Sequence, residues 1–166
     1  RISEYSERLL SGLENIDWPD PLKEMQRNWI GKSKGAMIKF SVENSEYSIE
    51  VFSTRPDTIF GATFITLAPE HDLVSKITTL SQENDVNNYI EISSKKSERD
   101  RISNVKTISG RFTGSYALHP FTGNKMPIWI SDYVIATYGT GAVMAVPCGD
   151  QRDFLFAKHF DLPIKN

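Results

Sequence analysis

The stretch AMIKFSVENSEYSIEVFS, residues 36–53, is the strongest single indication of the class of fold. Apolar side chains take alternate positions from Ala36 to Val42 and again from Tyr47 to Val51, which is the period of a half-buried strand. The polar residues 43–46 between the two runs are typical of a turn. The stretch therefore predicts an antiparallel β-hairpin.

The rest of the chain beyond residue 53 continues in blocks of strands with helices between them. We predict further strands at 62–68, 113–118, 126–130, 133–137 and 142–146, punctuated by Gly110, Gly114, Pro120, Gly123 and Pro127. The polar residues 71–101 predict helix, with one apolar face formed by Leu73, Val74, Ile77 and Leu80. Without regular strand–helix alternation, a mixed α/β fold with a mainly antiparallel, β-barrel-like sheet and peripheral helices is favoured over a doubly wound parallel one.

The first 30 residues have a helical pattern instead. Apolar residues recur every three or four positions over 1–16, which predicts an amphipathic helix. Asp20 and Pro21 predict an N-cap followed by proline at the first helical position of a second, short helix. We expect residues 1–30 to be a helical lead-in and residues 31–166 to be the domain proper. Because the chain begins at Arg1, we also expect it to be a fragment of a longer protein.

The composition bounds the function. A length of 166 residues suits one domain with its own core, and 39% hydrophobic with 24% charged residues is an ordinary globular balance. A net charge of −2 argues against a nucleic-acid binder that uses a large basic surface, so any RNA contact should be local and weak. The single cysteine, Cys148, excludes an intrachain disulfide and a cysteine-rich zinc site. With no apolar run of about 20 residues, we expect a cytoplasmic protein.

Ser53 to Thr58 form the first segment with chemical potential. A strand ends here, and a proline-fixed turn presents hydroxyls, a guanidinium and a carboxylate, a set that suits a sugar or a carboxyl ester. The alternative is a capped turn in which Asp57 and Thr58 satisfy backbone amides.

The second segment runs from Tyr138 through Pro147 and continues to Asp153. Two glycines allow close approach of a ligand or another chain segment, and a buried strand and a helix follow. Asp150 and Asp153 resemble a capping box, and both suit the positive end of a helix dipole. Alternatively, Asp153 is the anion that receives an ammonium group. No phosphate-loop pattern follows the glycines, the three histidines lack metal-ligand spacing, and Cys148 lacks a recognisable histidine partner.

Taken together, these segments resemble the editing insertion of leucyl-tRNA synthetases of bacterial or organellar type. The resemblance covers nearly the whole chain, and its most specific parts are residues 25–33, 54–58, 138–147 and 150–153. It implies a small β-barrel-like α/β fold that accepts the 3′ end of tRNA-Leu and hydrolyses the ester of a wrong amino acid such as isoleucine, methionine or norvaline. Valyl and isoleucyl editing domains are relatives, and their Thr-Thr-Pro-Trp-Thr type of segment is absent at 54–58.

The same resemblance assigns roles to residues. Asp153, expected to hold the α-ammonium group, and Thr58, expected to wall the side-chain pocket against leucine, are the candidate catalytic residues. The candidate substrate-binding residues are Thr54, Arg55, Met144, Asp150 and Arg152. No metal or cofactor is implied for editing, since ATP and Mg²⁺ belong to the synthetic domain, whose motifs are absent here. The implied partners are the terminal adenosine of tRNA-Leu and the remainder of the synthetase, with no membrane and a monomeric state.

One position departs from the family pattern. Where the family often has histidine just before the first aspartate of the last motif, this chain has Gly149. Gly149 keeps open the alternative of a degenerate module that binds the tRNA 3′ end without hydrolysis. Two further alternatives are a hydrolase of free aminoacyl adenylates and an editing domain for the charged tRNA of a related valyl or isoleucyl synthetase.

Overall fold

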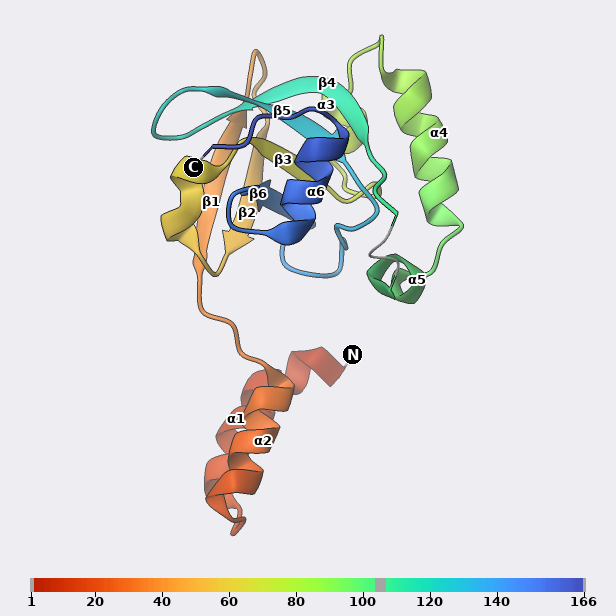
Figure 1. Cartoon of the computed structure of the whole chain (residues 1–166). Coiled ribbons are helices and arrows are strands. Elements are labelled where there is room, and N and C mark those ends of the chain that lie inside the picture. The colour runs from red at the N-terminus through yellow and green to blue at the C-terminus, as the bar shows by residue number, and fades with distance from the viewer. Residues whose placement is uncertain (1, 104–106, 166) are drawn as a thin grey trace. The chain divides into compact units, whose positions relative to one another are not determined.

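The computed structural model describes residues 2–103 and 107–165, and the chain forms two compact units, residues 1–34 and 35–166 (Figure 1). The first unit contains two short 3₁₀ helices and two α-helices: η1 (Ile2–Tyr5), α1 (Ser6–Gly12), η2 (Leu13–Asn15) and α2 (Asp20–Ile30). The predicted helix over 1–16 is thus divided between 3₁₀ and α geometry. Asp20 is the first residue of α2, so the N-cap is Pro19 and the prediction was wrong by one residue.

A six-stranded sheet forms the second unit. Its strands are β1 (Ala36–Val42), β2 (Ser48–Ser53), β3 (Phe64–Leu67), β4 (Arg111–Leu118), β5 (Lys125–Ile130) and β6 (Ala142–Ala145). They lie in the order β2-β1-β4-β5-β3-β6, and every neighbouring pair is antiparallel except the parallel pair of β3 and β5. The predicted hairpin is confirmed, with Phe40 paired to Ile49.

The sheet curves until its two edges approach each other. Residues of the edge strands β2 and β6 lie within 8 Å of one another, measured between Cα atoms. The sheet is therefore a nearly closed, barrel-like structure, as the sequence predicted.

Two apolar clusters lie on the two faces of this sheet. The larger one fills the barrel and contains the fully buried Phe40, Ile65 and Ile128. The smaller one joins Phe64 of β3 and Ala145 of β6 to Phe156 and Ala157 of α6 (Gln151–His159). Since Met144 belongs to the first cluster and Ala145 to the second, the strand alternation of β6 fixes which face each side chain meets.

The remaining described helices are η3 (Pro56–Gly61), α3 (Val74–Ile77), α4 (Glu83–Ser94) and α5 (Glu98–Ser103). Val74 and Ile77 are buried as predicted, whereas Leu80 is 90% exposed, so its place on the apolar face was wrong. The reason is that α3 ends before Leu80, where the Thr79 amide donates to the carbonyl of Thr113 in β4.

The strand predicted at 133–137 is absent, and the chain forms successive turns there. The physical cause lies in α5. The buried Arg101 guanidinium donates to the carbonyl oxygens of Asp132 (2.7 Å) and Val134 (2.6 Å), which a strand would offer to a neighbouring strand.

Candidate functional site

Asp153 lies in the first turn of α6, and its carboxylate is fixed at both oxygens. Oδ2 accepts a 2.8 Å hydrogen bond from the amide of Val146, directly after β6. Oδ1 lies 3.2 Å from the hydroxyl of Tyr133, which donates to it. Only 5% of Asp153 is exposed, so this is a buried acid whose orientation is set by two distant segments.

Asp150 is the N-cap of α6. Its Oδ1 accepts from the amides of Arg152 (2.8 Å) and Asp153 (3.0 Å). The N-cap prediction is therefore confirmed. The reciprocal half of the capping box does not form, because the Asp150 amide donates to the Val146 carbonyl while the Asp153 carboxylate is engaged elsewhere.

Burial changes the pKa of the Asp153 carboxyl. Removal from water raises the pKa of Asp153 to about 6, and the charge of Asp150 adds to the rise. The Val146 amide, the Tyr133 hydroxyl and the Arg152 guanidinium act in the opposite direction. At neutral pH the carboxylate is therefore mostly ionised, although only 5% of the residue is exposed.

The threonine segment forms a turn that its own side chains hold. The Ser53 hydroxyl accepts from the Arg55 amide at 3.1 Å, and Thr58 Oγ1 donates to the Arg55 carbonyl at 2.8 Å. The exposed Arg55 guanidinium makes two hydrogen bonds to Asp57, at 2.9 and 3.1 Å, and these lower the pKa of that carboxyl. Thr54 is exposed. The Thr58 hydroxyl is thus engaged within its own turn.

The end of this turn meets the segment that holds Asp153. The Thr63 amide donates to the carbonyl of Ala145 at 3.1 Å, which ties the chain after η3 to β6. A Cβ built on Gly61 would lie 3.1 Å from Val146 Cγ1 and 3.0 Å from Cys148 Sγ. Val146 thus touches the end of the threonine turn with its side chain and Asp153 with its amide.

The two glycines before β6 have left-handed backbone conformations. Gly139 and Gly141 have φ of 62° and 70°, which side chains other than glycine rarely adopt. A Cβ on Gly141 would also lie 3.3 Å from the Ala136 Cα atom. Met144, two residues into β6, is 7% exposed and belongs to the barrel core, so in this structure it packs against protein.

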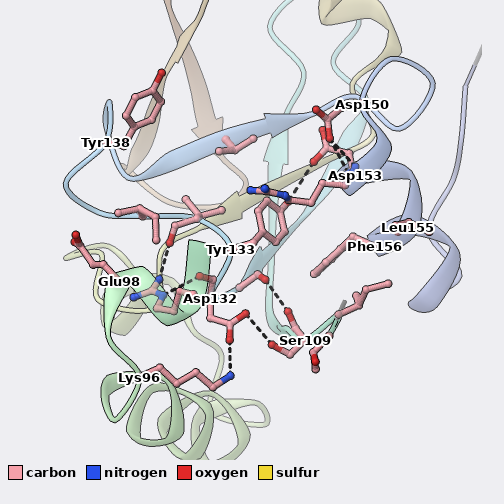
Figure 2. A pocket seen from close by; sticks show the side chains of 18 of the residues that line it. Lys96, Glu98, Ser109, Asp132, Tyr133, Tyr138, Asp150, Asp153, Leu155 and Phe156 are labelled. Atoms are coloured by element: carbon pink, nitrogen blue, oxygen red, sulfur yellow. Dashed lines mark hydrogen bonds and ion pairs between the residues drawn. The ribbon is translucent and has the colours of Figure 1, made fainter. Parts of the chain in front are cut away.

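A cavity of about 1040 Å³ opens beside the start of α6 (Figure 2). Of the predicted site residues, it brings together Asp150, Arg152 and Asp153. Tyr133, Tyr138, Val143 and Phe156 line it as well, and Lys96, Asp132 and Ser109 border its other side. Thr54, Arg55, Thr58 and Met144 are not among the described residues that line it.

Tyr133 is the site residue that the sequence did not reveal. It fell inside a predicted strand, and its contact with Asp153 joins residues that are 20 positions apart. Nothing in the local pattern distinguishes it from an ordinary core tyrosine.

The described residues contain neither a cluster of metal ligands nor a helix that could span a membrane. Among residues 2–103 and 107–165, no group of three or more His, Cys, Asp or Glu side chains is arranged to hold a metal ion. In the same part of the chain, no helix has the length and apolar character needed to cross a membrane.

Comparison with known proteins identifies the family. The family model described as "Leucyl-tRNA synthetase, editing domain" matches residues 27–166. Leucine–tRNA ligase of Christiangramia forsetii is 66% identical over all 166 residues, and that of Flavobacterium johnsoniae is 66% identical over 160 residues, or 96% of this chain. The chain spans 17% of the length of each of these two relatives.

A solved structure agrees with the family model and with the sequence relatives. It is the crystal structure of Agrobacterium radiobacter K84 agnB2 LeuRS in a ternary complex with tRNA and LeuAMS. The match covers 99% of this chain and 20% of the LeuRS chain, with a TM-score of 0.84 and 38% sequence identity. Family model, sequence relatives and fold coincide over residues that include Asp153 and the threonine turn, and the chain therefore belongs to the leucyl-tRNA synthetase editing-domain family.

Proposed function

We propose that this chain hydrolyses the ester between a wrong amino acid and the 3′ end of tRNA-Leu. The observation that carries the proposal is the Asp153 carboxylate, which is buried, held at both oxygens and set in the wall of a cavity. The α-ammonium of an aminoacyl ester is the complementary group. Such a charge-assisted contact contributes about 1.5–3 kcal/mol and fixes the ester in one geometry.

The reaction needs little more than placement, since an aminoacyl ester is already reactive. Water attacks the carbonyl carbon, the bond to the ribose oxygen breaks, and that oxygen takes up a proton. Two of the histidines are engaged elsewhere: His119 Nδ1 accepts from the Phe121 amide, and His71 Nδ1 accepts from the Leu73 amide. We assign direct attack by water, with Asp153 orienting the substrate rather than transferring the proton.

Discrimination against leucine requires a wall of defined shape. Leucine and isoleucine have the same volume, and one methylene gives a pocket only about 1–3 kcal/mol, so size alone does not separate them. The wall must clash with a branch at Cγ and tolerate one at Cβ. Thr58 suits this role because its hydroxyl bond to the Arg55 carbonyl fixes a side chain that is already stiff at χ1.

The substrate proposal extends to the RNA. The structural relative in complex with tRNA supports a tRNA partner for this chain. We propose that contact is limited to the single-stranded 3′ end, because a net charge of −2 offers no broad attraction to a duplex. A gel-shift titration should give weak binding that a tRNA lacking its 3′ end abolishes, and tight, salt-sensitive binding to duplex RNA would contradict it.

We propose that this domain acts as part of a longer synthetase chain. We assign residues 1–30 to a helical connection with the remainder of a synthetase. ATP and Mg²⁺ serve the synthetic domain in this scheme, and editing by residues 31–166 uses neither.

The test compares three substrates. Ile-tRNA-Leu, Val-tRNA-Val and isoleucyl adenylate are incubated separately with the chain, and with the same sequence placed in a full-length ligase. Hydrolysis confined to Ile-tRNA-Leu is expected. Preferential hydrolysis of Val-tRNA-Val or of the adenylate would instead favour the related-synthetase or the adenylate alternative.

Gly149 allows a direct test of the degenerate-module alternative. A Cβ there would lie no closer than 3.7 Å to Val146 Cγ1, so a side chain can leave the backbone at this position without a clash at its first carbon. If wild type is inactive and Gly149→His gains activity, the chain as it stands is a binding module. Comparable activity of both proteins is the expected result.

A further inference from the structure

The hydroxyl of Tyr133 lies beneath the start of α6, between two acceptors. Its oxygen is 3.2 Å from Asp153 Oδ1 and 3.2 Å from Thr66 Oγ1 on β3. A phenol has one proton to donate, so it serves one acceptor at a time, and the charged carboxylate is the stronger of the two. Burial raises the pKa of Tyr133 well above its usual 10, and the hydroxyl therefore stays a donor throughout the neutral range.

The ring that carries this hydroxyl has little freedom. It packs edge-on against Phe156, with centroids 5.7 Å apart, and the Arg152 guanidinium lies 5.7 Å from its centroid. Arg101 binds the backbone carbonyls on both sides of it, those of Asp132 and Val134. The position of the hydroxyl is thus set by helices α5 and α6 together, independently of Asp153 itself.

We propose that Tyr133 is a positioning residue, whose hydroxyl holds the Asp153 carboxylate in the rotamer that meets the ammonium group of the substrate. The inference rests on the proposed function, in which Asp153 receives that ammonium. With Val146 fixing one carboxylate oxygen and Tyr133 the other, the rotamer is determined before substrate arrives. Because the carboxylate is already ordered, substrate binding loses less side-chain conformational entropy.

The charged and polar groups around Asp153 determine how its ionised fraction depends on pH. Asp150 and Arg152 face it from α6, and Tyr133 faces it from the turn after β5. Asp150 raises the pKa of Asp153, while Arg152 and Tyr133 lower it. Removing the Tyr133 hydroxyl should therefore move that pKa upward from about 6, which reduces the ionised fraction near neutrality.

The test uses Tyr133→Phe, which removes one oxygen and keeps the ring. Tyr116→Phe is the matched control, since Tyr116 lies on β4 with its ring against Phe112. The Asp153 carboxyl pKa is measured by ¹³C NMR titration of the full chain, without any tRNA. Tyr133→Phe should raise it by roughly half to one unit, equivalent to one hydrogen bond, and Tyr116→Phe should leave it unchanged.

The kinetic readout follows from the same shift. The kcat/KM of Tyr133→Phe on Ile-tRNA-Leu should fall roughly 1.5- to threefold at pH 6.5, in proportion to the ionised fraction of Asp153, and recover toward wild type at pH 8, mainly through KM. An equal loss at every pH would show a merely structural role and overturn the proposal. So would an Asp153 pKa that the variant does not move.

A measurement on wild type alone keeps the proposal falsifiable if the variant does not fold. The ¹³Cζ signal of Tyr133 should shift with the same midpoint as the Asp153 carboxyl, because the proton acceptor of the phenol changes as that group ionises. Independent titration would contradict the contact. If the two signals titrate together and wild type hydrolyses no mischarged tRNA, the positioning contact stands and the hydrolytic function fails.

Discussion

The amide of Val146 donates a 2.8 Å hydrogen bond to Asp153 Oδ2, which ties the first turn of α6 to the end of β6. The side chain of the same valine faces Gly61, where the threonine turn ends. Val146 therefore links the end of the threonine turn to the aspartate at the start of α6.

Replacing Asp153 tests its role as the ammonium partner. Asp153→Ala should slow deacylation of Ile-tRNA-Leu by roughly ten- to a hundredfold, because about 1.4 kcal/mol corresponds to a factor of ten. Single-turnover deacylation measures it, with Asp153→Asn as the variant that removes the charge and keeps the size. Unchanged hydrolysis with a lowered melting temperature would reduce Asp153 to a structural link between α6 and β6.

The raised pKa of Asp153 predicts a specific dependence of stability on pH. Between about pH 4 and pH 6 the folded state keeps a proton on Asp153 that the unfolded state has lost, so the free energy of unfolding falls as pH rises. The contribution is full below the unfolded pKa of 3.8 and is lost as pH passes the folded value of about 6, a change of roughly 3 kcal/mol at most.

Urea unfolding of wild type and Asp153→Asn at pH 4, 5, 6 and 7 checks this. The stability of wild type relative to Asp153→Asn should decrease from pH 4 to pH 7, since asparagine does not titrate. A difference that stays constant over this range would show that Asp153 does not have a raised pKa.

Arg101 should be a principal support of the turn after β5. Arg101→Met would leave the carbonyls of Asp132 and Val134 without this donor and Glu70 without its ion pair, at a cost of roughly 2–5 kcal/mol. Thermal unfolding followed by circular dichroism measures the loss. The control is Lys95→Met, which breaks an exposed pair with Glu91 and should cost at most about 0.5 kcal/mol. Equal effects of the two variants would remove Arg101 from this role.

Thr58 is expected to be the residue that spares leucine. Thr58→Ala removes a methyl and a hydroxyl, which opens space for a branch at Cγ, so the variant should hydrolyse Leu-tRNA-Leu as well as Ile-tRNA-Leu. Thr58→Tyr should place a bulky ring at the proposed side-chain wall and block both substrates. If Thr58→Ala remains active on Ile-tRNA-Leu and still spares Leu-tRNA-Leu, its bond to the Arg55 carbonyl is only part of the turn.

Local patterns predicted most of the sheet and the cap of the last helix. The hairpin follows from the alternation between Ala36 and Val51, and Asp150 caps α6 because an N-cap bond forms within three residues of chain. Both features depend on neighbours in sequence, which is why reading the sequence identified them.

Features that depend on long-range contacts could not be predicted from local sequence patterns. The turn at 133–137 exists because Arg101, more than 30 residues earlier, takes its carbonyls, and Tyr133 meets Asp153 only once α6 packs against the sheet. The sequence indicated Asp153 both as a helix-cap residue and as an ammonium partner, but its contacts with Val146 and Tyr133 could not be predicted, since no local period relates the three.

The most direct test of the account compares two charged forms of one tRNA. Wild type, in the context of a full-length ligase, is incubated with Ile-tRNA-Leu and with Leu-tRNA-Leu, and the release of each amino acid is followed under identical conditions. The account predicts at least tenfold faster hydrolysis of Ile-tRNA-Leu, a difference of about 1.4 kcal/mol. Equal rates for both substrates, or no hydrolysis above that of tRNA alone, would contradict it.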